Sequence, residues 1–217
     1  MGASAGGVKA LQQFFEAIDD DLGLAYVVTM HLSPDHESQL SEVLGGRTRM
    51  PVYQVSNTPK LEPNCVYVIA PDTKLMIEGN GVRSCPFTEQ RGRRTPIDMF
   101  FRSIAAGRGD GFAVVLSGAA SDGAVGITKV KEADGVIFVQ DPGEAEYGMM
   151  PRSAMATGVA DFVEPIEGIA IRIAEVAQSR EGLRRMRDDD AEATSERSCR
   201  SFTSAPGTTS PTTSARR

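Results

Sequence analysis

The chain has 217 residues, 41% of them hydrophobic, which allows one substantial buried core. Its formal net charge of −6 argues against a protein whose main role is to hold nucleic acid, because such proteins usually present a basic face. No apolar run approaches the roughly 18 residues of a membrane span, the first residues lack the pattern of a secretory signal, and the odd number of cysteines has no metal-ligand spacing. We therefore expect a cytoplasmic protein without membrane insertion, disulfide framework or zinc site.

Short apolar runs typical of strands buried on both faces alternate with stretches of helical period. The expected strands are residues 24–32, 66–70, 112–118 and 135–141. The expected helices are residues 7–18, 36–44, 96–106, 123–133 and 166–187. This alternation predicts an α/β fold with a doubly wound, mostly parallel sheet and helices on both faces, a Rossmann-like three-layer sandwich. The Asn80-Gly81 pair between two short apolar runs at 74–86 predicts a small antiparallel β-hairpin.

The pattern divides the chain into a globular domain at residues 1–187 and a C-terminal segment at 188–217. The segment opens with Asp188, Asp189 and Asp190 and continues rich in serine and threonine, with little that could pack. Such a composition does not offset the entropy lost on ordering, so we expect a disordered tail or linker.

The chain opens with MGASAGG directly before an amphipathic stretch. Residues 2–6 match the pattern G-x-S-x-G, in which a sharp turn from strand to helix exposes a serine hydroxyl above the edge of a sheet. Ser4 is the candidate nucleophile on this interpretation. Two alternatives stay open from these residues alone: a glycine-rich loop that binds phosphate at a helix N-terminus, and a flexible chain end.

Two further chemical groups stand at the carboxyl ends of expected strands, where open parallel sheets form their sites. His31 ends the run LAYVVTMHL, and Asp122 follows the run FAVVLSGAAS. Ser4 needs a base, His31 needs a carboxylate on its second ring nitrogen, and Asp122 can supply one, so the three residues suit a catalytic triad. The alternatives are a core histidine and an aspartate that caps a helix.

Six stretches of the chain resemble the catalytic domain of the chemotaxis protein-glutamate methylesterases of the CheB type. They are GASAGG at 2–7, MHLSPDHES at 30–38, VYVIAPD at 66–72, RTPIDMFFRS at 94–103, LSGAASDG at 116–123 and GMMPRSA at 148–154. The stretches follow the order of the family across residues 2 to about 175. They are most similar to the esterase segment of hybrid proteins that also contain a methyltransferase and sensory domains.

The resemblance implies a triad of Ser4, His31 and Asp122 and an oxyanion hole formed by the backbone amides of Ala5 and Ala119. It implies hydrolysis of glutamate γ-methyl esters on bacterial chemoreceptors, with methanol as the first product, and a related deamidation of glutamines. The implied partner is a methylated chemoreceptor or receptor-like protein, and the similarity to hybrid proteins adds a methyltransferase or sensory partner. No metal or organic cofactor is implied.

Three further residues are candidate substrate contacts, and a fourth is a candidate for orienting the substrate. Arg94 lies in a basic cluster that could meet an acidic receptor surface, although charged loop residues are usually only solvated. Met150 and Pro151 could line the rim of the cleft, although methionine in such a loop more often fills a gap in the packing. Asp98 could orient a group on the substrate side, although an acid in the first turn of a helix is explained by the helix dipole.

The sequence departs from the family pattern in three places. Only Met1 precedes the first motif, where the family has a short apolar strand, so we expect the first strand to be missing and the turn at Ser4 to lack an anchor on one side. Ala120 stands where the family more often has glycine, which would strain the oxyanion loop if that position needs a positive φ. Nothing in the chain corresponds to the N-terminal receiver domain of most family members.

On this basis we expect a serine-dependent carboxylic ester hydrolase that needs no cofactor. The alternative from another class is a truncated or inactive esterase-like domain that keeps only receptor or partner binding. A nucleotide-binding module with GASAGG as its phosphate loop is a third hypothesis, although the stretch lacks the lysine of a P-loop and the spacing of G-x-G-x-x-G.

Overall fold

The computed structural model describes the backbone of residues 1–32, 38–90, 93–108 and 111–201. The chain divides into two compact units, Met1–Ala177 and Gln178–Arg217. The first unit is an α/β domain that contains every candidate site residue. The second unit is helical where it is described.

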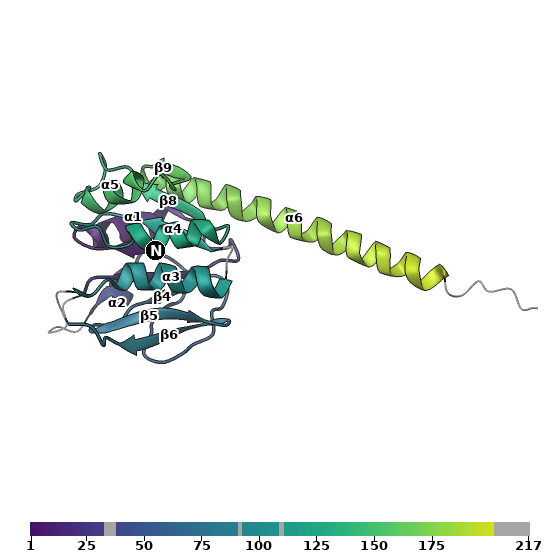
Figure 1. The fold of residues 1–217 in the computed structure, drawn as a ribbon, viewed down its shortest axis with the longest axis horizontal. Helices are drawn as coiled ribbons and strands as arrows, with labels where there is room; N and C mark the ends of the chain where they lie inside the picture. The colour runs from purple at the N-terminus through teal and green to yellow at the C-terminus, as the bar shows by residue number, and fades with distance from the viewer. Residues whose placement is uncertain (33–37, 91–92, 109–110, 202–217) are drawn as a thin grey trace, which may run out of the picture. The chain divides into compact units, whose positions relative to one another are not determined.

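Seven parallel strands form the main sheet of the first unit (Figure 1). They are β1 (Gly2–Ala3), β2 (Ala25–Met30), β3 (Val52–Gln54), β4 (Cys65–Val68), β7 (Phe112–Val115), β8 (Val136–Gln140) and β9 (Phe162–Glu164). Their spatial order is β3-β4-β2-β1-β7-β8-β9. From β1 the chain first adds strands on one side, and from β7 onward it adds strands on the other. The predicted doubly wound α/β fold is confirmed, and the strand order reverses between β1 and β7.

Helices cover both faces of this sheet. They are α1 (Gly7–Ala17), α2 (Leu40–Gly45), α3 (Pro96–Arg108), α4 (Ala124–Glu132), α5 (Met149–Ala156) and the part of α6 (Ile166–Ser201) that ends at Ala177. Successive residues of a strand point to opposite faces, so the two residues of β1 distinguish the faces. A Cβ on Gly2 would lie 2.4 Å from Cγ2 of Ile97 in α3, whereas the Cβ of Ala3 lies against Gly7 of α1. Helices α1 and α3 therefore enclose β1 from opposite sides.

The predicted hairpin is confirmed as a separate two-stranded antiparallel sheet. Its strands are β5 (Thr73–Glu78) and β6 (Gly81–Pro86), joined by a turn at residues 79–80. The hairpin packs against α3, where the hydroxyl of Ser103 accepts a hydrogen bond from the Ile77 amide at 3.0 Å. This contact fixes the hairpin on the same side of the sheet as α3.

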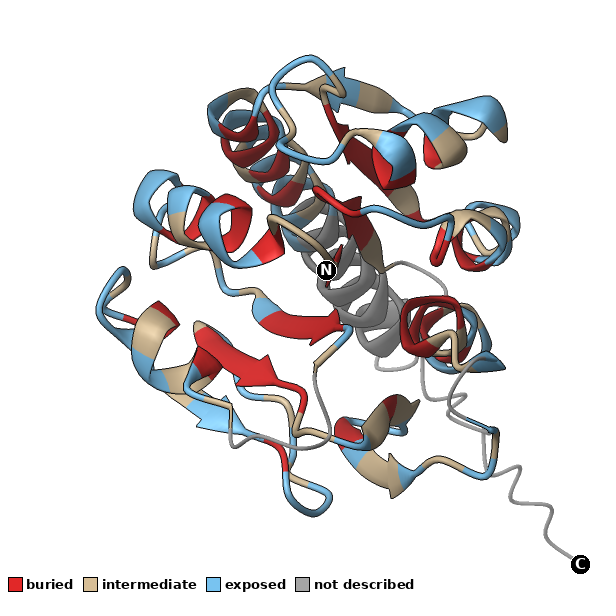
Figure 2. Ribbon diagram, turned by 90° about the vertical axis from the view of Figure 1, so that its left-hand side faces the viewer, coloured by how far each residue is buried: buried red, intermediate tan, exposed pale blue. Residues whose placement is uncertain are grey.

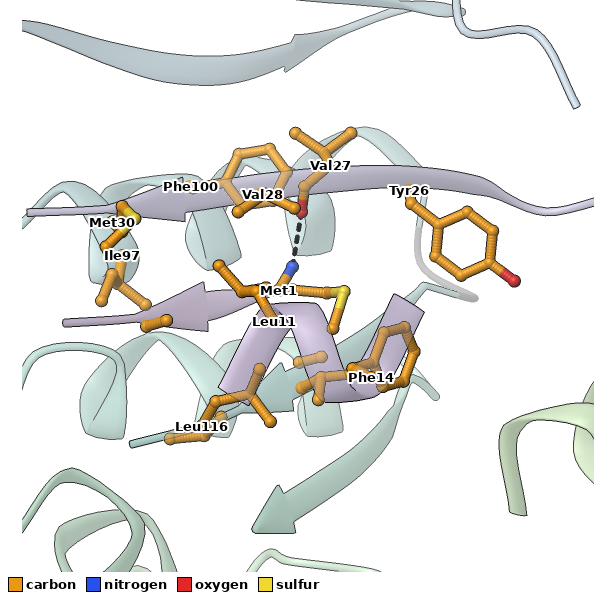
Figure 3. Packing of buried hydrophobic residues seen from close by; sticks show 14 of the residues in the cluster. Met1, Leu11, Phe14, Tyr26, Val27, Val28, Met30, Ile97, Phe100 and Leu116 are labelled. Atoms are coloured by element: carbon orange, nitrogen blue, oxygen red, sulfur yellow. Dashed lines mark hydrogen bonds between the residues drawn. The ribbon is translucent and has the colours of Figure 1, made fainter. Parts of the chain in front are cut away.

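A short strand occupies the position where the sequence predicts none. Gly2–Ala3 pairs in parallel with both β2 and β7. The carbonyl of Met1 accepts a bond from the Thr29 amide at 2.9 Å, and the buried α-amino group of Met1 donates to the Val27 carbonyl at 2.6 Å (Figure 3). The strand lies inside the first motif, so the expectation of a missing strand before Met1 stays a prediction. The turn at Ser4, which was expected to lack an anchor on one side, is anchored by this strand of two residues to both neighbouring strands.

The hydrophobic core lies between the sheet and its helices, and Figure 2 shows the buried residues on the strands and on the inward sides of the helices. Met1 belongs to this core, where Leu11, Phe14 and Val28 lie around it (Figure 3). An apolar environment disfavours a charged group. Burial accordingly lowers the pKa of the Met1 α-amino group from 8.0 to about 5.

Helix α6 reaches Ser201, beyond its predicted end at residue 187, so the predicted disorder of 188–217 does not extend over the described part of this segment. Charged side chains one turn apart support such a helix without a packed core, as in the pair of Glu181 and Arg185 at 3.0 Å. The compact units divide at Ala177, earlier than the predicted boundary at 187. In the part of the chain that the structure describes, no helix combines the length and apolar character needed to cross a bilayer.

Two predicted segments fall partly outside the described residues. Residues 202–217 belong to the predicted tail. Residues 36–37 begin the predicted helix at 36–44, of which the structure describes α2 at Leu40–Gly45.

Candidate active site

The predicted site lies at the carboxyl ends of three neighbouring strands. Strands β2, β1 and β7 are adjacent in the sheet, and His31, Ser4 and the segment 116–122 follow them in turn. The strand order reverses at this point, and open parallel sheets bind ligands there because the loops on either side diverge. The topology brings the three parts of the predicted triad to one edge of the sheet.

Ser4 stands in a tight turn between β1 and α1. Its amide donates to the Ser117 carbonyl at 2.9 Å, and its carbonyl accepts from the Gly7 amide at 2.8 Å. Gly6 has a φ of 70°, a left-handed conformation that favours glycine. A Cβ on Gly6 would also lie 2.7 Å from the Ser117 hydroxyl. The turn therefore depends on glycine, and it provides the strand-turn-helix context that G-x-S-x-G requires.

His31 and Asp122 are in direct contact. The Nε2 atom of His31 lies 2.9 Å from Oδ2 of Asp122. The side chain of His31 is 38% exposed, whereas that of Asp122 is 4% exposed. Because a carboxylate only accepts hydrogen bonds, Nε2 carries a proton in this contact, and Nδ1 is the acceptor nitrogen of the neutral ring. A buried acid thus holds one side of an imidazole whose other side is open to the surface.

Asp122 is fixed by two further hydrogen bonds. Its oxygens accept from the amide of Ile97 at 3.0 Å and from the amide of Asp98 at 2.9 Å. Both amides belong to the first turn of α3, so Asp122 caps a helix other than α4, which follows it in the chain. The capping interpretation and the triad interpretation of Asp122 are therefore compatible.

Asp98, in α3, bonds in turn to the first turn of α4. Its Oδ1 accepts from the amide of Gly126, in the first turn of α4, at 2.6 Å. Burial raises the pKa of the Asp98 carboxyl, and the nearby charge of Asp122 adds to this rise against the opposing effects of the Gly126 amide and Arg102. The two helices approach closely because Gly126 has no side chain: a Cβ there would lie 2.9 Å from the Asp98 carbonyl oxygen.

The contact between Ser4 and His31, which would complete the triad, is not formed in the described part of this structure, and the proposed oxyanion amides are unpaired. Within the described residues, the Ser4 hydroxyl makes no hydrogen bond to His31, and the amides of Ala5 and Ala119 have no acceptor. Such unpaired amides are free to donate to a developing oxyanion. Ala120 is not among the described residues with a positive φ, so the strain expected at that position does not arise.

A cavity of about 140 Å³ opens beside His31. Its other lining residues are Met30, Leu32, Ala70, Asp72, Thr73, Phe87, Arg94 and Pro96. The Arg94 guanidinium lies 4.4 Å from the centroid of the Phe87 ring, donates from Nη1 to Asp72 at 2.5 Å and donates from Nε to the Glu89 carbonyl at 3.2 Å. Arg94 therefore lies beside the histidine, where it forms part of a pocket wall.

Met150 and Pro151 are buried in the first turn of α5. Met150 is 1% exposed, and a Cβ on Gly118 would lie 2.5 Å from its sulfur. This burial argues against the predicted direct substrate contact for both residues, because their side chains fill space under the loop. Met149, in the same turn, is exposed at 56%.

Ser117, which bonds to the turn at Ser4 and Ala5, was not predicted as a site residue. The only local signal was a polar residue directly after the buried run FAVVL. Its partners lie far away in the sequence, so the pattern around it did not show its bonds.

The described residues of the site offer no metal centre. No group of three or more His, Cys, Asp or Glu side chains is arranged there to hold an ion. Activity without a metal or organic cofactor stays a prediction.

Curated relatives share this domain. The chain is 42% identical over 137 residues to an uncharacterized 104.1 kDa protein in the hypE 3′ region of Rhodobacter capsulatus, an alignment that covers 63% of this chain and 14% of that protein. It is 31% identical over 172 residues to a putative protein-glutamate methylesterase/protein-glutamine glutaminase of Leptospira interrogans, covering 78% of this chain and 89% of the relative. It is 32% identical to protein-glutamate methylesterase/protein-glutamine glutaminase 3 of Burkholderia orbicola, covering 78% of this chain and 51% of the relative.

A solved structure has the same fold. The Thermotoga maritima CheB methylesterase catalytic domain superposes with a TM-score of 0.73 at 23% identity, covering 81% of this chain and 95% of that one. The resemblance drawn from the six sequence stretches is confirmed. Since the model of the CheB methylesterase family matches residues 1–173, the chain belongs to the CheB methylesterase family.

Proposed function

We propose that this domain is a serine hydrolase that removes methyl groups from glutamate γ-methyl esters of bacterial chemoreceptors and deamidates glutamines of such proteins. The 2.9 Å contact between His31 and Asp122, beside the turn that carries Ser4, is the observation on which the proposal depends. A histidine held by a buried carboxylate can activate a neighbouring hydroxyl. The names of the Leptospira and Burkholderia relatives supply the substrate class.

In the proposed reaction, Nδ1 of His31 accepts the hydroxyl proton while Oγ of Ser4 attacks the γ-carbonyl carbon. The two ring nitrogens thus exchange roles relative to the chymotrypsin-type proteases, in which the carboxylate bonds to Nδ1 and the serine proton goes to Nε2. The carbonyl oxygen becomes an oxyanion that the amides of Ala5 and Ala119 stabilise. Each such donor is typically worth about 3 to 4 kcal/mol of transition-state stabilisation.

The tetrahedral intermediate collapses when His31 returns the proton to the methoxy oxygen, and methanol leaves. Water then attacks the acyl group on Ser4, with His31 again as base, and releases the free glutamate. On a glutamine side chain the same steps release ammonia in place of methanol. Asp122 holds the imidazole in one tautomer throughout and stabilises its charged form.

The proposed partner is a methylated chemoreceptor or receptor-like protein. The chain spans only 14% of the Rhodobacter protein and 51% of the Burkholderia protein, so the activity of a whole protein of either kind is part of the proposal. The methyltransferase or sensory partner and the cytoplasmic location stay predictions from the sequence.

A methanol-release assay on a methylated chemoreceptor tests the proposal. We expect the wild-type chain to release methanol and Ser4→Ala to lose about 10⁴-fold or more of that rate, with an unchanged circular dichroism spectrum. Equal rates in the two proteins would contradict Ser4 as the nucleophile. Receptor binding by the wild-type chain without any methanol release would favour the alternative, an inactive esterase-like domain that only binds.

A further inference from the structure

We propose that Ser117 is a positioning residue that holds the Ser4–Ala5 turn and the loop leading to Ala119 in fixed register. The inference rests on the proposed function, because it assigns a role in the same reaction. Ser117 stands two residues after the end of β7, between the two segments that carry the proposed oxyanion amides. Its side chain does not reach the surface: the residue is 1% exposed.

Ser117 holds the nucleophile turn at two points. Its carbonyl accepts from the Ser4 amide at 2.9 Å, and its hydroxyl donates to the Ala5 carbonyl at 2.9 Å. These two bonds flank the peptide unit whose N–H belongs to Ala5. Ser117 thus holds the backbone on both sides of this unit, and the Ser4 carbonyl of the unit itself accepts from the Gly7 amide at 2.8 Å. Together these bonds limit the directions in which the Ala5 N–H can point.

The same hydroxyl also holds the loop on the other side of the site. It accepts from the Tyr147 amide at 3.0 Å, while the Tyr147 carbonyl accepts from the Gly118 amide at 2.9 Å. The Gly118 carbonyl in turn accepts from the Met150 amide at 2.9 Å. Gly118, which precedes Ala119, is thus fixed to the start of α5 by bonds on both sides.

A polar side chain anchors the backbone of Ser117 itself. The Ser117 amide donates to Oε1 of Gln140 at 2.9 Å, and Nε2 of Gln140 donates to Glu144 at 2.9 Å. The same Glu144 oxygen accepts from the Ile166 amide at 3.0 Å. Gln140 is buried, at 2% exposure. The chain of bonds makes Ser117 a fixed point against which both loops are placed.

This arrangement matters for the reaction because the two amides must face one oxygen atom. A displacement of about 1 Å in such a site can cost about 10²-fold in rate. Without the hydroxyl, the Ala5 carbonyl and the Tyr147 amide would both lose their partner in a part-buried place. Each loop could then relax separately, and the amides of Ala5 and Ala119 would no longer converge.

Ser117→Ala tests the role, and Ser103→Ala is its matched control. The buried hydroxyl of Ser103 makes the same pair of bonds, donating to the Phe100 carbonyl at 2.7 Å and accepting from the Ile77 amide at 3.0 Å. Ser103 joins α3 to the hairpin and is not part of the proposed site. Both variants remove one buried hydroxyl, so we expect comparable falls in melting temperature.

Two readouts separate positioning from stability. The first is kcat and KM for methanol release from methylated chemoreceptor, and the second is the rate at which a fluorophosphonate labels Ser4, followed by intact mass. For Ser117→Ala we expect kcat and the labelling rate to fall by about 10- to 100-fold, with KM within about threefold of wild type. For Ser103→Ala we expect both rates to stay within about twofold.

Rates for Ser117→Ala equal to those of Ser103→Ala would overturn the inference. Should Ser117→Ala not fold, Ser117→Cys keeps a side chain of similar shape with weaker hydrogen bonding, and its labelling rate should still fall by at least about fivefold. A wild-type rate in that variant would equally overturn it. Labelling of wild-type Ser4 without methanol release would count against the proposed substrate alone, while the labelling rates would still decide the role of Ser117.

Discussion

The carboxylates of Asp98 and Asp122 cap each other's helices. Asp122, two residues before the start of α4, accepts from amides in the first turn of α3, and Asp98 in α3 accepts from the Gly126 amide of α4. Each negative charge thus lies at the positive end of a helix dipole. Because Asp122 also bonds to the imidazole of His31, the contact between the two helices fixes the position of the histidine.

We expect Asp98→Ala to lower the free energy of unfolding by about 1 to 3 kcal/mol, because the Gly126 amide loses its buried acceptor. Asp98→Asn keeps an acceptor oxygen and should remain within about 1 kcal/mol of wild type at neutral pH. Urea denaturation of the three proteins measures the difference. A loss for Asn as large as that for Ala would show that the charge, and not the hydrogen bond, stabilises the junction.

The raised pKa of Asp98 also predicts a dependence on pH. The folded state holds the Asp98 proton more tightly than the unfolded state, whose pKa lies near the ordinary 3.8. Stability from this group is therefore fully present below that value and is lost as the pH rises through the folded pKa. Because asparagine does not titrate, the free energy of unfolding of Asp98→Asn should rise relative to that of wild type as the pH is raised from 3.5 to 7. A constant difference across this range would contradict the raised pKa.

Arg94 should affect substrate binding more than catalysis. We expect Arg94→Ala to raise KM for methanol release about tenfold, with a smaller effect on kcat, because the pocket wall formed with Asp72 and Phe87 loses a charge-assisted bond and a stacked cation. Arg94→Lys should recover little, since an ammonium does not reproduce the planar contacts. Arg83→Ala is the control: this exposed arginine on strand β6 pairs with Glu78 at 3.3 Å. A similar KM change in the control would assign the effect to net charge.

The buried amino group predicts a second pH effect in a chain that begins at Met1. Its pKa is about 5 in the folded state against 8.0 in the unfolded state, so the unfolded chain binds more protons between these values. Stability should therefore rise with pH across this window, by up to about 4 kcal/mol. Denaturation at pH 5.5, 7 and 8 measures the rise. The variant with His31→Gln and His36→Gln should keep it, and its disappearance there would assign the effect to histidine.

Much of the fold could be predicted because its signals are local. Continuous apolar runs predicted the buried strands, and the Asn80-Gly81 pair predicted the hairpin. Strand β1 gave no such signal, since two small residues form no apolar run, and only pairing on both sides makes them a strand. The helix at 166–187 was predicted too short because its end was set from composition, which shows how little of the segment could pack. Composition does not show the charged pairs one turn apart that stabilise a helix.

Some features of the site could likewise be predicted from local sequence, and others depend on residues far apart in the chain. Ser4, His31 and Asp122 could be proposed because each follows a strand, and topology alone then places them at one edge. The burial of Met150 under Gly118 could not be predicted, because it depends on contact between segments far apart in the sequence. The same holds for the bond between Asp98 and Gly126.

The most direct test of the central claim is a double-mutant cycle on methanol release with Ser4→Ala, His31→Ala and the two changes combined. Groups that act as one unit lose their effect together, so we predict that each single change lowers kcat by about 10⁴-fold and that the combined change is no more than about threefold worse. Losses that multiply in the combined variant would contradict the account, because they would mean that the serine and the histidine contribute independently.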